Sequence, residues 1–253
     1  MRDAVNNYYM YSLNERIQKT IISELKSLRC TASLSGEAQR LLASTGVKRE
    51  YTLNDYVWKI GEPGEYIAII VSGLVEISRH SGGDDEMTMG IFGPSDVIGI
   101  SAVMKKSTYP GNAKSLTKDC EVIKLYLRPV LNGPGPDAHE LQTWVRETML
   151  LHEQVLRDKI DILNAGNVEN RIYELLKHLL RRFGVHESQS RHFIPLRITR
   201  AQAAKMINVR VETMIRMLSK WQRQKFIRWT QKGILIENLP LLEKNLSSKQ
   251  GLK

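Results

Sequence analysis

Residues 198–221, ITRAQAAKMINVRVETMIRMLSKW, contain two helical patterns separated by a short apolar turn. Thr199 is a good N-cap residue, and the small Ala204 allows a second helix to cross the first closely. The stretch therefore predicts a helix-turn-helix, with a first helix at about 200–206 and a second at about 211–223.

The second of these helices is amphipathic. At 100° per residue, one side carries the large apolar residues Met214, Met217, Leu218 and Trp221. The opposite side carries Glu212, Ile215, Arg216 and Ser219. Glu212 and Arg216 are four residues apart, which suits either an ordinary intrahelical salt bridge or contacts with another surface.

The segment after this helix, FIRWTQKGILIEN at 226–238, predicts two strands joined by a short turn. Lys232 would lie at the tip of that hairpin. A helix-turn-helix followed by such a hairpin is the winged variant of the motif.

Basic residues are concentrated in the C-terminal part of the chain. The net charge of the 253 residues is +10, and residues 166–253 hold 18 Lys and Arg against 6 Asp and Glu. A basic module joined to a nearly neutral one is expected if the C-terminal part meets a polyanion such as DNA.

DNA binding would give the exposed helix face a specific chemistry. Arg216 can offer its planar guanidinium to guanine O6 and N7, and Glu212 can accept from the N4 amine of cytosine. The predicted base-contacting residues are Val211, Glu212, Ile215, Arg216 and Ser219. The cations predicted to contact phosphates are Arg200, Lys205, Arg210, Lys220 and Lys232.

A β-rich region precedes the basic module. Between about Val57 and Tyr126, short β-rich runs alternate with turn sequences such as GEPGE, SGGDDE and GPSD. This pattern predicts an antiparallel β roll or barrel. Helical spacing over Leu13–Leu28 and Ser35–Ser44 predicts two helices ahead of it.

A long helix is expected after the strands. The sequence NGPGPD at 132–137 interrupts the strand pattern, and Asp137 is a plausible N-cap. From His139 to Leu163 there is no Pro or Gly, and apolar residues recur every seven positions. We expect this helix to dimerise through Leu141, Trp144, Thr148, Leu151, Val155 and Ile162, with packing against the chain's own β domain as the alternative.

The predicted fold is α+β: an N-terminal β roll, a long dimerisation helix and a C-terminal winged helix-turn-helix. A hinge-like Asn164–Asn167 and a further helix at Asn170–Phe183, closed by Gly184, lead into the last of these. The predicted domains are a sensor at 1–132, the long helix at 133–165, the DNA-binding domain at 166–240 and a polar tail at 241–253.

The sequence lacks motifs of catalysis, secretion and membrane insertion. It has no GxGxxG, phosphate loop, nucleophile elbow or metal-spaced His/Glu pair, and no apolar run near the roughly 20 residues that span a bilayer. Cys30 and Cys120 supply neither a disulfide framework nor a four-cysteine metal site. We expect a cytoplasmic protein that is not an enzyme, with no catalytic residues, no bound metal and no membrane partner.

Taken together, these elements resemble the cyclic-AMP receptor and fumarate–nitrate regulator (Crp–Fnr) family of bacterial transcription regulators. The resemblance covers about residues 34–237 and rests on the order of elements, on the helix-turn-helix stretch, on GEPGEYIAIIVSGLVEIS at 61–78 and on GPSDVIG at 93–99. It implies a homodimer joined through the long helix, a ligand or redox sensor in the roll, inverted-repeat double-stranded DNA and, for an activator, RNA polymerase as a partner.

The resemblance also implies a half-site. The recognition helix of the fumarate–nitrate branch has the pattern Val-Glu, two residues, Ser-Arg. Val211, Glu212 and Arg216 match this pattern, whereas Ile215 replaces the serine. A TGA-like half-site is therefore expected.

The sensor departs from its relatives. In those that bind cyclic nucleotides, the glycine matching Gly99 precedes a Glu for the ribose hydroxyl, and an Arg-Ser pair some ten residues later holds the cyclic phosphate. This chain has Ile100, and Pro110-Gly111 in place of the pair. Because neither an apolar residue nor proline can replace these groups, we expect no cyclic AMP in the usual pose.

Two alternatives for the sensor stay open. A cyclic nucleotide could bind in a non-standard pose with Lys105, Lys106 or Lys114 on its phosphate, or the roll could dock a protein without any ligand. The cysteine cluster of iron–sulfur relatives is missing, and haem would depend on the isolated His80 or His152. No cofactor is predicted, and the identity of a small-molecule effector is left open.

Overall fold

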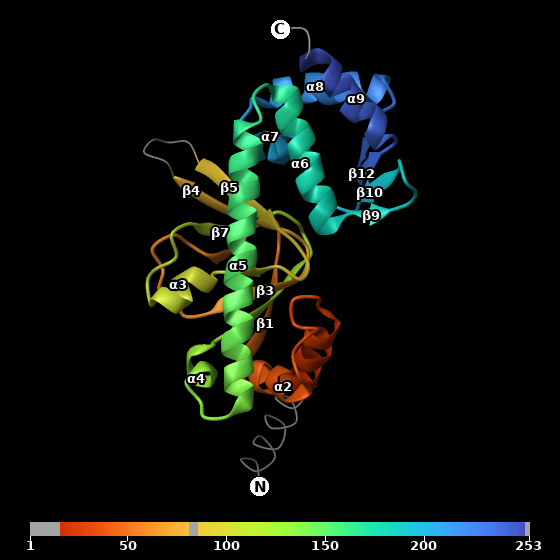
Figure 1. Cartoon of the computed structure of the whole chain (residues 1–253). Coiled ribbons are helices and arrows are strands. Elements are labelled where there is room, and N and C mark those ends of the chain that lie inside the picture. Colours follow the sequence, from red (N-terminus) through yellow and green to blue (C-terminus); the bar gives the residue numbers. More distant parts are fainter. Residues whose placement is uncertain (1–15, 81–85, 251–253) are drawn as a thin grey trace. The chain divides into compact units, whose positions relative to one another are not determined.

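The computed structural model describes residues 16–80 and 86–250. The chain forms two compact units, one up to Gln154 and the other from Val155. The division falls inside the long helix labelled α5 (Pro136–Asn164), which sequence analysis had assigned to a segment of its own (Figure 1). The predicted α+β architecture of β roll, long helix and winged helix-turn-helix is confirmed.

The first unit contains a roll of two antiparallel sheets. Its strands are β1 (Gly46–Tyr51), β2 (Tyr56–Trp58), β3 (Ile67–Ser72), β4 (Val75–His80), β5 (Glu86–Phe92), β6 (Val97–Ile98), β7 (Asn112–Ser115) and β8 (Cys120–Leu125). One sheet has the order β1-β8-β3-β6 and the other β2-β7-β4-β5. The non-sequential order shows that the chain passes repeatedly between the two sheets.

Strand β1 lies outside the region in which strands were predicted. It pairs with β8 over its full length, from Gly46 opposite Leu125 to Tyr51 opposite Cys120. Its Lys-Arg-Glu run conceals the strand pattern in the sequence, because charged residues are uncommon in strands. As an edge strand, β1 can leave Arg49 and Glu50 exposed to water.

Gly73 shows why the turns between strands need glycine. It has φ +80° between β3 and β4, and a Cβ at this position would lie 2.5 Å from Thr117 Oγ1. Left-handed backbone and lack of space both exclude a larger residue. The turn between β3 and β4 therefore requires glycine at this position.

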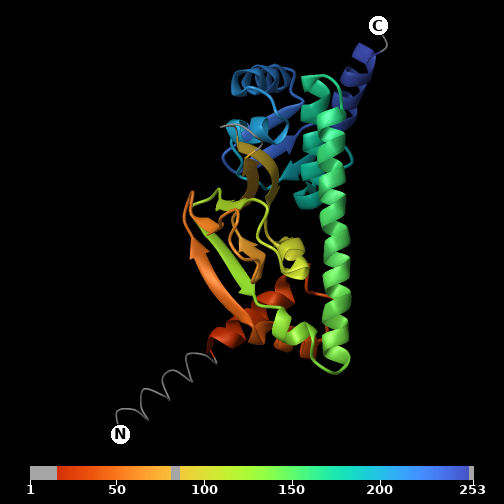
Figure 2. The same cartoon turned by 90° about the vertical axis from the view of Figure 1, so that its left-hand side faces the viewer.

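Several helices flank the roll. Residues 16–27 are helical, and α2 (Gly36–Ser44) is capped by Ser35, whose side chain accepts from the Ala38 N–H, so that both predicted N-terminal helices are present in the described residues. Two short helices were not predicted, α3 (Ile100–Lys105) and α4 (Arg128–Leu131). Figure 2 shows α3 between the strands of the roll and α5. The core that joins these helices to the roll includes Ile21, Leu25, Leu42, Ile69, Ile123, Leu141 and Trp144.

The long helix begins one residue before its expected N-cap. Asp137 is not the N-cap, because α5 already starts at Pro136, after a Gly135 with φ +113°. Proline is favourable in a first helical turn, where its missing N–H has no helical partner in any case. Near this end, the Ser35 N–H and hydroxyl donate to Glu140 at 2.7 and 2.6 Å, which ties α2 to α5.

The second unit is the winged helix-turn-helix. Its elements after α5 are α6 (Val168–Phe183), β9 (Val185–His186), β10 (His192–Ile194), α7 (Arg200–Met206), α8 (Val211–Arg223), β11 (Ile227–Thr230), β12 (Gly233–Ile236) and α9 (Leu239–Gln250). The strands form one antiparallel sheet in the order β11-β12-β10-β9. Its core contains Ile172, Leu176, Ala203, Leu218, Trp221 and Ile236, each at most 1% exposed.

Helix α6 is held to the last turns of α5 by a buried histidine. Asn167 caps α6 by accepting from the Asn170 N–H, and Gly184 closes the helix by donating to the Leu180 carbonyl at 2.8 Å. His178 Nδ1 lies 2.8 Å from Asp158, and its Nε2 lies 3.3 Å from an Arg182 nitrogen. A neutral imidazole satisfies both contacts, with Nδ1–H donating and Nε2 accepting.

The segment predicted as a polar tail, 241–253, is helical for most of its length. Helix α9 buries Leu242 and Leu246, and Glu243 accepts from the Tyr173 hydroxyl of α6 at 2.5 Å. The prediction of a tail was wrong because two apolar residues four apart are enough to attach a helix that is otherwise polar.

Candidate nucleic-acid interface

The helix-turn-helix has the bounds that sequence analysis predicted for it, 200–206 and 211–223. Thr199 caps α7 in a capping box, accepting from the Gln202 N–H at 3.1 Å while Gln202 Oε1 accepts from the Thr199 N–H at 2.7 Å. In the turn, Asn208 takes the left-handed conformation with φ +53°. These local contacts fix the direction in which α8 leaves the turn.

The inner face of α8 anchors the motif. Met214, Leu218 and Trp221 are fully buried, as the helical projection predicted, whereas Met217 is half-buried. Buried side chains of this size contribute roughly 1.5–3 kcal/mol each. The inner face therefore fixes which side of α8 is turned to solvent.

The outer face of α8 carries the predicted base-contacting residues. Glu212, Ile215 and Arg216 are exposed, and Val211 and Ser219 are half-buried at its edges. Within the described residues neither Glu212 nor Arg216 takes part in an ion pair, so the intrahelical salt bridge is not formed. Both side chains keep their hydrogen-bonding groups available for another surface.

The predicted phosphate-contacting cations differ in their surroundings. Lys205 and Arg210 are exposed, and Arg200 is half-buried at the start of α7. Lys220, in contrast, donates to Glu169 Oε1 at 2.9 Å and is engaged within its own unit. The charge of Lys220 is thus partly neutralised before any DNA arrives.

The wing places Lys232 at an exposed turn between β11 and β12. Gly233 follows it, and a Cβ there would lie 2.3 Å from the Ile194 carbonyl oxygen. The Trp229 indole N–H donates to the Ile198 carbonyl at 3.1 Å, which joins the wing to the segment that leads into α7. The predicted hairpin and the position of Lys232 at its turn are confirmed.

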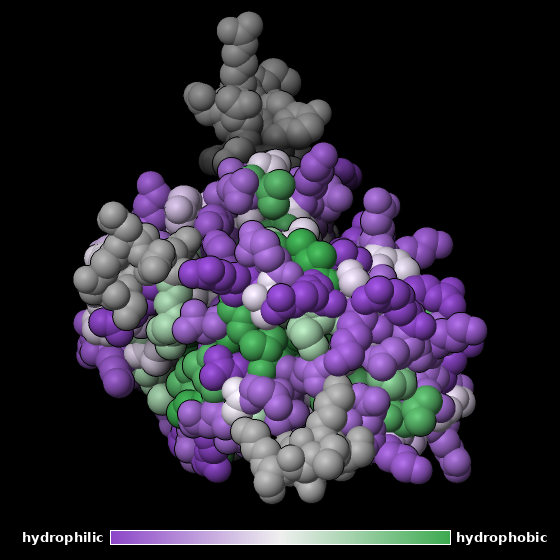
Figure 3. All heavy atoms as spheres, turned by 90° about the horizontal axis from the view of Figure 1, so that it is seen from above, coloured by the Kyte–Doolittle hydropathy of each residue, from purple (hydrophilic) through white to green (hydrophobic). Residues whose placement is uncertain are grey.

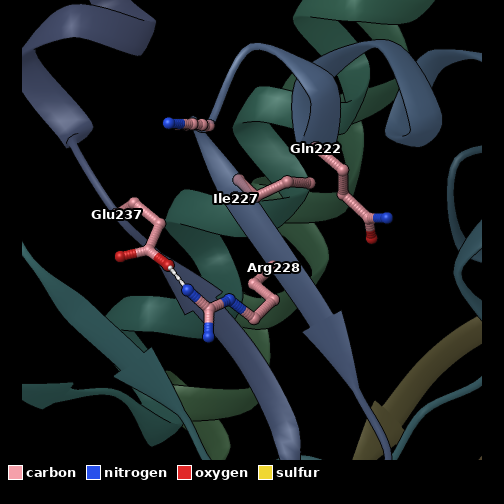
Figure 4. A pocket seen from close by; sticks show the side chains of 5 residues that line it. Gln222, Ile227, Arg228 and Glu237 are labelled. Atoms are coloured by element: carbon pink, nitrogen blue, oxygen red, sulfur yellow. Dashed lines mark hydrogen bonds and ion pairs between the residues drawn. The ribbon is translucent and has the colours of Figure 1, made fainter.

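A hollow of about 380 Å³ lies beyond the C-terminal end of α8, lined by Gln222, Lys225, Ile227, Arg228 and Glu237. Figure 4 shows Arg228 directed at Glu237, and the two form an ion pair at 2.7 Å. Arg228 belongs to β11, beyond the end of α8 that is opposite to Glu212, and its guanidinium already has a carboxylate partner, so we do not count it with the DNA-contacting cations.

The surface around these elements is predominantly hydrophilic. Figure 3 shows a face on which purple hydrophilic side chains surround smaller green hydrophobic patches. In the second unit, the exposed large apolar side chains include Leu156, Ile160, Val185, Ile215 and Leu241. Ile215 is the member of this set that lies on the outer face of α8.

The structure places Gly99 and Ile100 at the start of α3, and Pro110 and Gly111 just before β7. Gly99, with φ +84°, precedes α3, and the following Ile100 is 1% exposed within the core. Gly111 is buried, and a Cβ there would lie 2.6 Å from the Ser78 carbonyl oxygen. Pro110 is exposed and offers no N–H, so none of the four predicted positions supplies a charged or hydroxyl side chain.

An aromatic pair occupies the space beside these glycines. The rings of Trp58 and Tyr109 are stacked with centroids 4.2 Å apart, and a Cβ on Gly99 would lie 3.0 Å from the Trp58 ring. The Trp58 indole N–H donates to the Gly111 carbonyl at 3.1 Å. The glycines therefore accommodate the chain's own aromatic side chains.

Cys30 is half-buried and Cys120 is buried, and neither forms a disulfide within the described residues. Burial raises the pKa of Cys30 to about 12, and it also raises the pKa of Cys120, so both thiols stay protonated. His152 contacts the Val97 carbonyl through Nε2, and the side chain of His80 lies outside the described residues. In the part of the chain that the structure describes, no three His, Cys, Asp or Glu side chains form a group that could hold a metal ion.

Three of the residues predicted for a dimer seam on α5 are covered by the chain itself. Leu141, Trp144 and Thr148 are at most 5% exposed, and the Trp144 indole N–H donates to the Cys30 carbonyl at 2.6 Å. Ile162 is also buried, Val155 is half-buried, and Leu151 is 65% exposed. The seven-residue spacing therefore marks mainly a face of α5 that packs within the chain. This agrees with the alternative interpretation, in which the helix packs against the chain's own β domain.

A second apolar stripe on α5 was missed. Met149, Leu156 and Ile160 are 38%, 49% and 56% exposed, and at 100° per residue they lie on one side of the helix, roughly 120–160° around its axis from Trp144. Their spacings of seven and four residues fit the repeat of helices that pair. The signal was present in the sequence, but the more regular stripe on the other face concealed it.

Across the described helices, none is both long enough and apolar enough to cross a lipid bilayer.

The order of β roll, long helix and winged helix-turn-helix, together with the exposed face of α8, is that of a DNA-binding transcription regulator with a cyclic-nucleotide-binding-like roll. Two protein families match the chain: "Cyclic nucleotide-binding domain" over residues 48–132 and "Crp-like helix-turn-helix domain" over residues 170–244. The chain belongs to the Crp–Fnr family.

Curated relatives and solved structures agree with this assignment. The chain is 25% identical over 192 residues to the "CRP-like cAMP-activated global transcriptional regulator" of Mycobacterium tuberculosis, a match that covers 72% of this chain and 80% of that protein. It is 26% identical over 207 residues to the "Anaerobic regulatory protein" of Bacillus subtilis, which covers 80% and 84%. The structure of the c-di-GMP responsive global regulator CLP of Xanthomonas campestris is similar in fold, with a TM-score of 0.63 at 19% identity, covering 81% of this chain and 100% of that one.

Proposed function

We propose that this regulator acts as a homodimer that binds an inverted repeat with TGA-like half-sites. The observation that carries the proposal is the outer face of α8, where Glu212 and Arg216 are exposed and take part in no ion pair within the described residues. A planar guanidinium and a carboxylate one helical turn apart suit adjacent base edges in the major groove.

Each residue of the outer face has a proposed role. Arg216 donates to guanine O6 and N7, and Glu212 accepts from a cytosine N4 amine. Ile215 is 40% exposed and supplies an apolar contact of the kind that thymine methyl groups favour. Val211 and Ser219 border these contacts.

The phosphate contacts set the register of the complex. Arg200, Lys205, Arg210 and Lys232 are proposed to contact the DNA backbone without distinguishing sequence. Lys220 was predicted to join them, but its ion pair with Glu169 makes it the weakest member of the set.

The dimer is proposed to form through the exposed stripe of Met149, Leu156 and Ile160. This assignment replaces Leu141, Trp144 and Thr148, which the chain already covers. Two copies of α5 that pair through the stripe would bury these apolar side chains and supply two recognition helices for the two half-sites. If the protein activates transcription, RNA polymerase is its further partner.

Binding of a full-length protein to labelled DNA tests the proposal. Fluorescence anisotropy would compare a duplex that carries two TGA-like half-sites in inverted repeat, about one helical turn apart, with a duplex whose half-sites are scrambled. The expected result is binding at least about 1,000-fold tighter to the repeat at physiological salt. Equal affinity for both duplexes would contradict sequence-specific recognition.

The roll is proposed not to bind cyclic AMP in the usual pose. The name of the Mycobacterium tuberculosis relative describes it as cAMP-activated, but this chain has Ile100, Pro110 and Gly111 at the positions that would hold ribose and phosphate. A buried anion without a charged partner costs several kcal/mol. Calorimetric titration with cyclic AMP and cyclic GMP should give no heat of binding, whereas micromolar binding with a gain in DNA affinity would overturn this part.

A further inference from the structure

A groove of about 370 Å³ lies in the first unit where α3, α4 and α5 meet. Its lining residues are Val103, Met104, Lys106, Arg128, Leu131, Asn132, Gln142, Val145, Arg146 and Met149. The volume lies within the range of roughly 300–1,000 Å³ that is typical of small-molecule sites. The residues proposed to contact DNA all lie in the second unit, so DNA recognition does not account for this groove.

The floor of the groove is apolar. Val103, Leu131 and Val145 are at most 8% exposed, and the side chains of Met104 and Met149 are exposed at its rim. Such a floor favours a hydrocarbon body over a small hydrated ion, because it offers contact area and no hydrogen bonds. Met104 can adjust its shape to an apolar ligand, whereas Met149 also belongs to the proposed dimer stripe and borders the groove from that side.

Three cations surround this floor, and the lining contains no acidic residue. Arg128 donates to the Gly64 carbonyl at 3.2 Å, and Arg146 donates to Thr143 Oγ1 at 2.8 Å. Each guanidinium has five N–H donors, so these bonds leave donors for a ligand. Within the described residues, no carboxylate forms an ion pair with Lys106, Arg128 or Arg146, and their positive charge is uncompensated.

Local hydrogen bonds hold the walls in place. Gln142 Nε2 donates to the Leu131 carbonyl at 2.7 Å, which ties α5 to α4. Asn132 Nδ2 donates to the Arg128 carbonyl at 3.2 Å. Lys106 ends α3 in the left-handed conformation with φ +52°. The backbones that carry the cations are therefore fixed before a ligand arrives, which lowers the entropic cost of binding.

We propose that this groove binds a small amphipathic carboxylate, with the carboxylate between Arg128 and Arg146 and the hydrocarbon body on the floor of Val103, Leu131 and Val145. Guanidinium groups match carboxylate geometry with paired hydrogen bonds. A neutral apolar molecule would leave the three cations without a partner, and a bare inorganic anion would leave the apolar floor in contact with water.

This site differs from the cyclic-nucleotide position of the roll. Gly99 precedes the first turn of α3, whereas the groove uses Val103 and Met104 from the second half of α3 and the capping Lys106. The site also goes beyond the proposed DNA recognition, and it can be tested without DNA.

Calorimetric titration of the full-length protein provides the test, with octanoate, 1-octanol and octylammonium as probes of the same hydrocarbon length. We expect octanoate to bind at least about tenfold more tightly than either of the others, because only its head group complements the cations. The double variant Arg128→Gln, Arg146→Gln should weaken octanoate by at least about tenfold and leave 1-octanol unchanged.

Lys105→Gln provides the matched control, because it removes a neighbouring exposed lysine of α3 that does not line the groove. Circular dichroism of each variant confirms that it is folded. Equal binding of the three probes, or octanoate binding that persists in the double variant, would overturn the proposal. The proposal would also be overturned if the wild-type protein bound no octanoate and the double variant changed the monomer–dimer equilibrium in the absence of octanoate. The groove would then be a contact between copies.

Discussion

Helices α8 and α5 are both amphipathic, but they divide their surfaces differently. The thirteen-residue α8 buries one apolar face, and its other face carries Glu212 and Arg216. The 29-residue α5 has an apolar face inside the chain, with Leu141 and Trp144, and a second apolar stripe turned to solvent. A helix with one apolar face needs one partner, whereas a helix with two needs a second surface.

This difference fits the two proposed roles, DNA recognition for α8 and dimer formation for α5. On α8 the exposed face is mostly polar, as expected of a surface that contacts DNA. On α5 the exposed stripe of Met149, Leu156 and Ile160 is apolar, as expected of a surface that pairs with another apolar surface. The following experiments test that distinction, starting with the largest expected effect.

Leu156→Glu should abolish the dimer. Two glutamates would enter the proposed seam without partners, and an uncompensated buried charge costs about 3–5 kcal/mol. Sedimentation should then show monomers that no longer bind the inverted repeat specifically. Leu151→Glu is the matched control, since Leu151 is also an exposed leucine of α5, at 65% against 49% for Leu156, but lies on another side of the helix. If Leu151→Glu dissociates the protein and Leu156→Glu does not, the exposed stripe is not the interface.

Leu141→Ala should lower the free energy of unfolding by about 2–5 kcal/mol, because it opens a cavity in the core of the first unit. Leu150→Ala, on the same helix but 65% exposed, should change that free energy by less than about 0.5 kcal/mol. Chemical denaturation measured at one fixed protein concentration compares the two. Similar values would mean that the two faces of α5 do not differ in burial in solution.

Arg216→Ala should cost about 1–3 kcal/mol on the inverted repeat and little on scrambled DNA. Lys232→Ala should weaken both duplexes alike and reduce the dependence of log Kd on log salt by about one unit. Anisotropy titrations at several salt concentrations measure both quantities. If Arg216→Ala lost the same binding free energy on both duplexes, Arg216 would contact phosphate and not a base.

Acidification should destabilise the second unit through His178. Burial, with a smaller contribution from the Arg182 guanidinium, lowers the pKa of His178 below its ordinary 6.5. The unfolded chain therefore takes up this proton at higher pH than the folded one, so the stability is present above about pH 6.5 and declines as the pH falls below it. Thermal melts between pH 7.5 and about pH 5.5 should show a smaller decline for His178→Gln than for wild type. The exposed His139→Gln should behave as wild type.

The sequence was most informative where local rules decide the structure. Thr199 and Gln202 form a capping box within one turn, and three apolar residues specify the inner face of α8, so both helix ranges could be predicted. The wing followed from turn chemistry around Gly233. These features depend on residues close together in the chain.

Features set by distant residues were harder to predict. Strand β1 depends on pairing with β8, and its charges at Lys48, Arg49 and Glu50 concealed it. Several residues expected in the dimer seam on α5 lie inside the chain, because periodicity shows that a stripe is buried without showing what buries it. Trp144 illustrates this, since its partner, the Cys30 carbonyl, lies 114 residues earlier in the sequence.

The close contact at Gly111 limits which substitutions the roll tolerates. A side chain there would meet the Ser78 carbonyl oxygen at 2.6 Å, and a carboxylate at position 100 would enter a core site that is 1% exposed. Either substitution by itself would destabilise the fold, through overpacking at Gly111 or through an unpaired buried charge at position 100. A designed nucleotide site in this roll would therefore need several compensating substitutions at once, made together with changes around the stacked Trp58 and Tyr109 rings.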